Sequence, residues 1–165
     1  MNYQNEIKII KSIVNKTIQN NNKILVCGNG GSASDSNHIV AEFVGKFERK
    51  RPPYNALSLT SNVALLTAIG NDFGFEHIFS RQIEAVGNEK DLLIAISTSG
   101  TSPNIISSID VAIDKGLEVI FISGNKIKSI KNDLTHIRID SNITSTVQES
   151  YMFILHNVVR LIENE

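Results

Sequence analysis

Two polar side chains four residues apart, His38 and Glu42, follow a glycine-rich turn in an expected helix. This spacing places both on one helix face, where they can ligate a divalent metal, act as base and acid, or form a surface ion pair. A second pair, Gln148 and His156, lies among apolar residues of a long C-terminal helix, where a histidine is often an ordinary core residue. If the two helices meet, two imidazoles and a carboxylate suit zinc, whereas an amide oxygen is a less usual ligand.

Two polar turns offer a place for an anion. Residues 28–32 (GNGGS) form the first turn, and residues 97–102 (STSGTS) form the second, with five hydroxyl side chains in six positions. Each turn is expected to precede a helix, so hydroxyls, backbone N–H groups and the helix dipole favour a phosphate. Neither turn contains Lys or Arg, and neither matches a P-loop or a GxGxxG dinucleotide turn. The pattern predicts a phosphomonoester of a small metabolite, with an ordinary polar connection as the alternative.

The elements that must position these groups alternate along the chain. This order predicts an α/β fold, a doubly wound and mainly parallel sheet flanked by helices, as one domain over residues 1–165. In such a sheet ligands bind beyond the carboxyl ends of the strands, where both turns lie. The expected strands are 23–27, 56–59, 91–97, 117–123 and 136–139. The expected helices are 3–20, 34–47, 61–69, 76–86, 103–115, 126–131 and 145–162.

Several other positions receive structural interpretations. Ser61 and Ser102 are expected to cap helices. Residues 70–75 are expected as a loop, in which Asn71 and Asp72 either bind sugar hydroxyls or form a plain turn. The charged residues 48–51 (ERKR) are expected in a solvated loop, with contact between their basic side chains and an anionic substrate as the alternative. His77 and His136 fit no cluster of polar residues and are expected at the surface.

The composition excludes several classes of protein. The net charge of −1 gives no basic field for nucleic acid or for an anionic membrane. No apolar run approaches the ~20 residues that span a bilayer, and the polar N-terminus has no apolar signal segment. A single cysteine, Cys27, excludes an internal disulfide. We expect a cytoplasmic, soluble protein in which Cys27 is a buried structural thiol.

Four segments together resemble the phosphoheptose isomerases of the sugar isomerase (SIS) domain superfamily: CGNGGSASDSNHIVAE, TAIGNDFGFEHIFSRQIEAVG, ISTSGTSPN and VQESYMFILH. The resemblance runs from about residue 5 to 163. It implies a SIS-domain three-layer sandwich and a homotetramer with active sites between subunits, in which helix 3–20 packs on the core or at a subunit interface. It also implies interconversion of D-sedoheptulose 7-phosphate and D-glycero-D-manno-heptose 7-phosphate, toward the heptoses of lipopolysaccharide, capsule or glycoprotein.

The resemblance also implies roles for individual residues. It implies one Zn²⁺ per subunit, held by His38, Glu42, Gln148 and His156. For proton transfer through an enediol, Glu42 is the candidate base and His156 the candidate acid or second base. The implied substrate contacts are Asn29, Gly30, Gly31, Asn71, Asp72, Ser97, Thr98, Ser99, Ser102 and Gln148.

The sequence departs from the family at three places. Thr146 and Val147 precede Gln148 where relatives often have Arg-Ile, Ser145 replaces an Asp or Thr, and Lys46 stands where many have Arg. Three other readings stay open. A paralogue that binds the replication initiator lacks the counterparts of Glu42 and His156. A phosphosugar-binding module needs only the Ser/Thr turn, and an isomerase acting on another phosphosugar would share the whole site.

Overall fold

The chain folds into alternating strands and helices in this computed structural model, which describes residues 3–127 and 134–164. The strands are β1 (Ile24–Gly28), β2 (Ala56–Ser58), β3 (Leu92–Ser97), β4 (Glu118–Ser123) and β5 (Thr135–Arg138). The helices are α1 (Gln4–Gln19), α2 (Gly31–Val44), α3 (Val63–Phe73), the short 3-10 helix η1 (Phe75–His77), α4 (Ser80–Val86), α5 (Pro103–Asp114) and α6 (Thr144–Glu163).

The described strands form one sheet in the order β2-β1-β3-β4-β5, and each neighbouring pair is parallel. The chain moves outward in one direction from β1 to β2 and in the other from β3 to β5. The switch point of this topology therefore lies between β1 and β3, where ligands bind in open parallel sheets. Both polar turns follow these two strands, as predicted.

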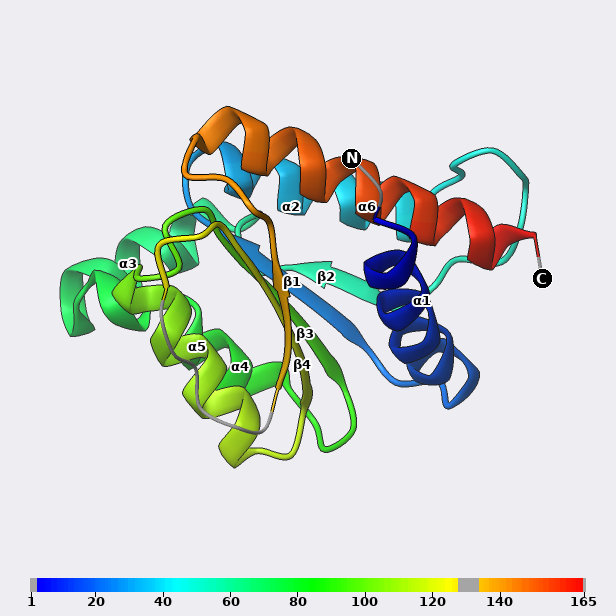
Figure 1. Ribbon diagram of the computed structural model, residues 1–165. Helices are drawn as coiled ribbons and strands as arrows, with labels where there is room; N and C mark the ends of the chain where they lie inside the picture. Colours follow the sequence, from blue (N-terminus) through cyan, green and yellow to red (C-terminus); the bar gives the residue numbers. More distant parts are fainter. Residues whose placement is uncertain (1–2, 128–133, 165) are drawn as a thin grey trace.

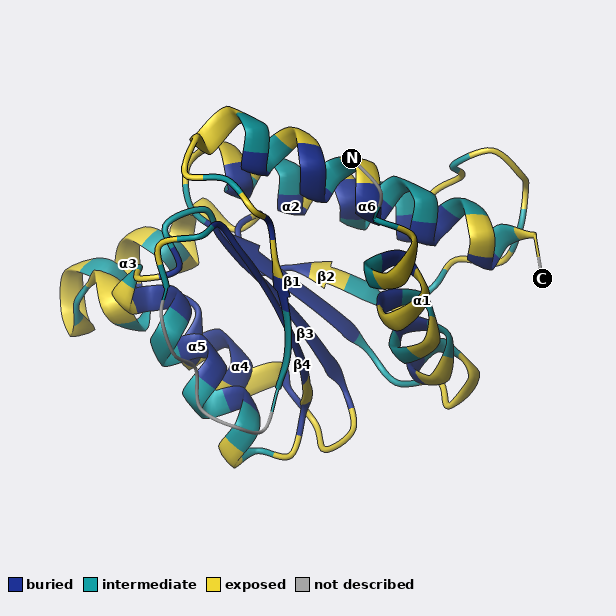
Figure 2. Cartoon of the chain, viewed as in Figure 1, coloured by how far each residue is buried: buried dark blue, intermediate teal, exposed yellow. Residues whose placement is uncertain are grey.

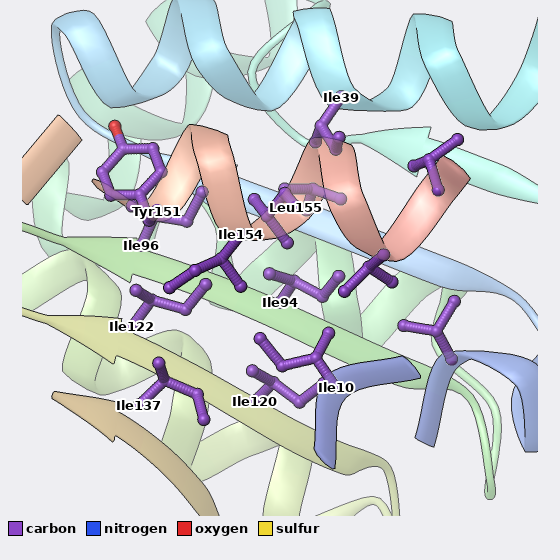
Figure 3. Packing of buried hydrophobic residues seen from close by; sticks show 14 of the residues in the cluster. Ile10, Ile39, Ile94, Ile96, Ile120, Ile122, Ile137, Tyr151, Ile154 and Leu155 are labelled. Atoms are coloured by element: carbon purple, nitrogen blue, oxygen red, sulfur yellow. The ribbon is translucent and has the colours of Figure 1, made fainter. Parts of the chain in front are cut away.

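Helices cover the sheet on both faces, which gives three layers (Figure 1). The helices α1, α2 and α6 lie on one face, whereas α4 and α5 lie on the other. Successive strand side chains point to opposite faces, so Val26, Ile94 and Ile122 pack under α6 while Cys27, Ala95 and Phe121 pack under α5. Figure 2 shows the buried central strands between helices that are exposed outward. Figure 3 shows Tyr151, Ile154 and Leu155 of α6 above the isoleucines of the sheet.

The predicted architecture is confirmed, and several boundaries are corrected. Helix α2 begins at Gly31 rather than at residue 34, because Gly30 adopts a φ of +56° that turns the chain directly into the helix. Helix α3 is capped by the side chain of Asn62 rather than Ser61, and it extends to Phe73. Asn71 and Asp72 therefore lie on its last turn, not in a loop. The expected helix at 126–131 falls mostly outside the described residues.

No described helix has the length and apolar character needed to cross a membrane.

Candidate active site

Helices α2 and α6 run side by side in the same direction and bring three candidate ligands together. His38 and Glu42 come from α2, and His156 comes from α6. Their ligand atoms all lie within 4.8 Å of one another. His38 Nε2 is 3.2 Å from a Glu42 carboxylate oxygen, and the two imidazole centroids are 5.0 Å apart. The structure therefore brings together three of the four predicted zinc ligands.

The environment of His156 fits a metal ligand better than a satisfied core residue. Its ring stacks on Phe47 at a centroid distance of 5.3 Å. Its Nε2 atom is buried and has no hydrogen-bond partner among the described residues. Burial, followed by the nearby charge of His38, lowers the pKa of His156. A neutral imidazole with an unsatisfied nitrogen facing another imidazole and a carboxylate suits Zn²⁺.

The fourth predicted ligand, Gln148, lies near the glycine turn. A Cβ atom added at Gly31 would overlap the Gln148 amide nitrogen, so glycine permits this close approach. Gln148 also hydrogen-bonds Tyr151. The rise of an α-helix separates Gln148 from His156 by about 12 Å along α6. Its place among the metal ligands remains a prediction, whereas its approach to the turn fits its predicted contact with substrate.

A buried hydrogen-bond network joins α2 to α6 beside the ligand cluster. The hydroxyl of Tyr151, which is fully buried, donates to Asp35 Oδ2 at 2.5 Å and pairs with Ser32 Oγ at 2.9 Å. Burial and the bond to Asp35 raise the pKa of Tyr151 well above its usual range, so the phenol stays protonated. Sequence reasoning missed Ser32, Asp35 and Tyr151 as site residues. The signal was Asp35, which precedes His38 by three residues and so shares its helix face.

The Ser/Thr turn forms the other half of the site. Ser97 Oγ lies 3.1 Å from Ser102 Oγ and 3.4 Å from Ser99 Oγ, and it accepts a hydrogen bond from Gly100 N at 3.2 Å. Ser102 occupies the N-cap position of α5, but its side chain makes no capping bond, contrary to expectation. The hydroxyls therefore lie close together at a helix N-terminus. Each hydroxyl group can rotate to donate a hydrogen bond to a phosphate oxygen. Thr98 is half-buried beside them.

A reciprocal amide pair connects the two turns across the switch point. Asn29 Nδ2 donates to Asn104 Oδ1 at 2.8 Å, and Asn104 Nδ2 donates to Asn29 Oδ1 at 2.7 Å. Asn104 is only 1% exposed and also accepts from Ile105 N at 3.0 Å. Asn29 was among the residues predicted from the sequence, but Asn104 was not; its position immediately after Pro103 at the start of α5 was the available signal.

Asn71 and Asp72 are not brought to either group. Both side chains are exposed, and Asn71 Nδ2 donates to Asp72 Oδ1 at 2.7 Å. In the described part of the chain no hydrogen bond or ion pair joins them to the ligand cluster or to the Ser/Thr turn. The structure therefore places Asn71 and Asp72 apart from both groups of site residues in this chain.

Three other sequence interpretations can be compared with the structure. Cys27 is fully buried, which raises its pKa to about 12 and agrees with a structural thiol. His136 is half-buried rather than at the surface, because its ring stacks on Phe121 and its Nε2 pairs with Ser123 Oγ at 2.8 Å. Arg51 is likewise not a solvated residue, since its side chain is only 10% exposed and pairs with Glu163.

Comparison with known proteins assigns this fold and site to a class. The SIS domain family matches residues 2–124, and the chain belongs to that family. Within it, the chain is 41% identical over 161 residues to the phosphoheptose isomerase of Akkermansia muciniphila, an alignment that covers 97% of this chain and 85% of that protein.

Solved structures agree with this placement. A phosphoheptose isomerase from Francisella tularensis superimposes with a TM-score of 0.93 at 34% identity, covering 98% of this chain and 87% of that one. Phosphoheptose isomerase GmhA from Neisseria gonorrhoeae gives a TM-score of 0.90 at 32% identity, covering 99% of this chain and 88% of that one. These relatives place the chain among the phosphoheptose isomerases.

Proposed function

We propose that this protein is an aldose–ketose isomerase that converts D-sedoheptulose 7-phosphate to D-glycero-D-manno-heptose 7-phosphate. The observation that carries the proposal is the convergence of His38, Glu42 and His156 from two helices. Its relatives carry the name phosphoheptose isomerase at about 40% identity over most of their length. The product would supply heptose for bacterial lipopolysaccharide, capsule or glycoprotein, and we expect the enzyme to act in the cytoplasm.

The reaction moves a carbonyl from C2 to C1 of the sugar. A base removes a proton from C1 while O2 gains one, which gives an enediol; O1 then loses its proton while C2 receives one. We assign the first transfer to Glu42, whose carboxylate faces both imidazoles. We assign the second transfer to His156 as the acid or second base, because its imidazole lies in the same cluster as Glu42.

The residues present fit a zinc ion. His38, Glu42 and His156 would hold it, with Gln148 as the predicted fourth ligand. The bound ion would polarise the sugar carbonyl and stabilise developing negative charge on oxygen. The buried Nε2 atom of His156, which lacks a hydrogen-bond partner in the described structure, supports this assignment.

The remaining groups would orient the substrate. Ser97, Thr98, Ser99 and Ser102 would bind the phosphate, and the N-terminus of α5 adds a favourable dipole. Asn29, Gly30 and Gly31 would contact the sugar at the start of α2. Holding both ends of the sugar would fix C1 and C2 next to Glu42. This positioning lowers the entropic part of the activation barrier.

We also propose that the enzyme is a homotetramer with active sites between subunits. The exposed positions of Asn71 and Asp72 support this arrangement, because side chains that make no contact with the site of their own subunit would be available to the site of another. Apolar side chains on α3 and η1 are also exposed, including Val63, Phe73 and Phe75.

The deciding experiment is NMR of sedoheptulose 7-phosphate with the purified protein in D₂O, with and without zinc. We expect an aldoheptose 7-phosphate to appear, deuterium to enter at the exchanged carbon, and both to be lost on chelation. Conversion that survives thorough chelation would support the isomerase activity but contradict a requirement for a metal ion. Saturable binding without conversion by the zinc-loaded protein would instead establish a phosphosugar-binding module.

A further inference from the structure

The carboxylate of Glu163, on the last turn of α6, is buried in a ring of hydrogen-bond donors. Its oxygens accept from three successive backbone N–H groups, those of Phe47 at 3.2 Å, Glu48 at 2.9 Å and Arg49 at 3.1 Å. Only 1% of the Glu163 side chain is exposed. Three converging N–H groups form an anion-binding nest, so the end of α6 is fastened to the loop that follows α2.

Arg51 completes this fastening. Its Nε atom forms an ion pair with Glu163 at 3.0 Å, and its guanidinium lies over the ring of Tyr54 at 3.9 Å. Its remaining nitrogens donate to the carbonyl oxygens of Phe43 at 2.8 Å and Glu42 at 2.5 Å. The loop is therefore tied both to the end of α6 and to the backbone of the proposed base, Glu42.

The fastened loop places one side chain against the ligand cluster. Phe47 stacks on His156 with an interplanar angle of 25°. Arg160, one helical turn beyond His156, binds Glu48 at 2.7 Å and lies 5.5 Å from the Phe47 ring. The Phe47 ring therefore contacts both Arg160 and His156, and it covers an imidazole whose Nε2 is buried.

We propose that Glu163 is a positioning residue that closes residues 46–51 over His156. The closed loop fixes the orientation of the imidazole through Phe47 and keeps water from its Nε2 atom. Glu163 acts through Phe47 and touches neither His38 nor His156 in the described structure. The inference rests on the proposed function for its kinetic effect, but loop closure and metal binding can be measured without turnover.

The first test compares Glu163→Gln with Glu149→Gln, which changes the same charge at an exposed position on the same helix. An amide would turn an N–H group toward the nest, so we expect Glu163→Gln to open the loop. Trypsin should then cut after Lys46, Arg49 or Lys50 about tenfold faster. Groups that orient metal ligands typically contribute 10–100-fold to affinity or activity. The dissociation constant for zinc should therefore rise about tenfold, and kcat should change more than KM.

The second test separates the loop from the ring that it carries. Phe47→Ala should weaken zinc binding, measured by competition with a chromophoric chelator, while tryptic cleavage stays slow; Phe47→Tyr should restore the binding. Because both residues act through one contact, Glu163→Gln combined with Phe47→Ala should bind zinc no more weakly than the more affected single variant.

Each outcome decides the proposal. It is overturned if Glu163→Gln speeds tryptic cleavage but leaves the zinc affinity unchanged, or if the two substitutions weaken zinc binding additively. It is also overturned if Glu163→Gln remains folded by circular dichroism and its loop stays as resistant as that of Glu149→Gln. If the wild-type protein does not isomerise the heptose phosphate, the proposed function fails, whereas the cleavage and zinc measurements still test the role of Glu163.

Discussion

At the scale of single residues, His156 shows how the fold changes the interpretation of a side chain. In the sequence it is one polar residue in an apolar helix, which usually means a satisfied core histidine. In the structure its buried Nε2 has no described partner, and His38 and Glu42 stand next to it. An unpaired buried nitrogen costs about 1–3 kcal/mol, which a bound metal ion would offset.

The assigned roles of Glu42 and His156 give a direct prediction. Glu42→Gln keeps the shape but removes the base, and His156→Ala removes the second proton-transfer group. We expect each to lower kcat by at least about 10²–10⁴-fold, while circular dichroism and the oligomeric state match the wild type. Full activity in either folded variant would remove the proposed mechanism.

The Asn29–Asn104 pair gives a second prediction. The two amides bond each other reciprocally, so Asn29→Ala leaves the buried Asn104 Nδ2 unpaired and Asn104→Ala leaves the half-buried Asn29 amide without its partner. We expect Asn29→Ala and Asn104→Ala each to raise KM, and the double variant to show a coupling of about 0.5–3 kcal/mol in kcat/KM. Strictly additive effects in this double-mutant cycle would mean that the pair does not act as a unit.

At the scale of elements, α2 and α6 form the site because they are parallel and share one face of the sheet. Ser32, near the start of α2, pairs with Tyr151 of α6, and Glu42, near the end of α2, lies in the ligand cluster with His156 further along α6. The loop after α2 then fastens to the end of α6 through Glu163. The two helices are thus joined along their length, which keeps ligands from distant parts of the chain in register.

The buried carboxylate at this junction predicts a pH dependence of stability. Burial alone would raise the pKa of Glu163, but three backbone N–H groups and Arg51 outweigh it and lower the pKa. A carboxyl with a lower pKa in the folded state stabilises the protein above its unfolded pKa of about 4.3, and this stabilisation is lost as the pH falls through the folded value.

Urea unfolding between pH 7 and pH 3 measures this effect. The wild type should lose its stability advantage over Glu163→Gln as the pH falls below about 4.3. Glu149→Gln, altered at an exposed position, should follow the wild type throughout. A difference between wild type and Glu163→Gln that is constant across this range would show that the carboxylate charge does not contribute.

At the scale of the whole molecule, α3 exposes several of its large apolar side chains. Among its residues only Ile69 is buried, whereas Val63 is 68% exposed and Phe73 is 50% exposed. Exposed apolar side chains gathered on one element mark an interaction surface. The same helix carries Asn71 and Asp72, which have no described bond to the rest of the site.

These observations lead to a prediction about assembly. Val63→Glu combined with Phe73→Glu would place charges in the proposed subunit contact, at a cost of several kcal/mol when desolvated. We expect light scattering after gel filtration to show smaller species with little activity and intact secondary structure. Glu84→Gln, an exposed change on α4, should leave the tetramer intact; an active monomer of the double variant would contradict sites shared between subunits.

The sequence determined the architecture and most of the candidate residues. Alternating apolar strands and amphipathic helices fixed the order of the elements, because both periodicities depend only on local geometry. The positions of the two polar turns followed from the parallel topology. The contact between His38 and Glu42 was predicted correctly, because residues at i and i+4 of a helix are neighbours on its surface.

The tertiary structure decided which side chains from different helices, strands and loops contact one another. The approach of His156 to His38 joins residues more than a hundred positions apart, and no local pattern measures such a distance. The same holds for the Asn29–Asn104 pair and for Arg51, whose charged segment suggested solvent although its guanidinium is buried against Glu163. Polar groups that leave water must find partners, and only the packing of distant segments selects which partners those are.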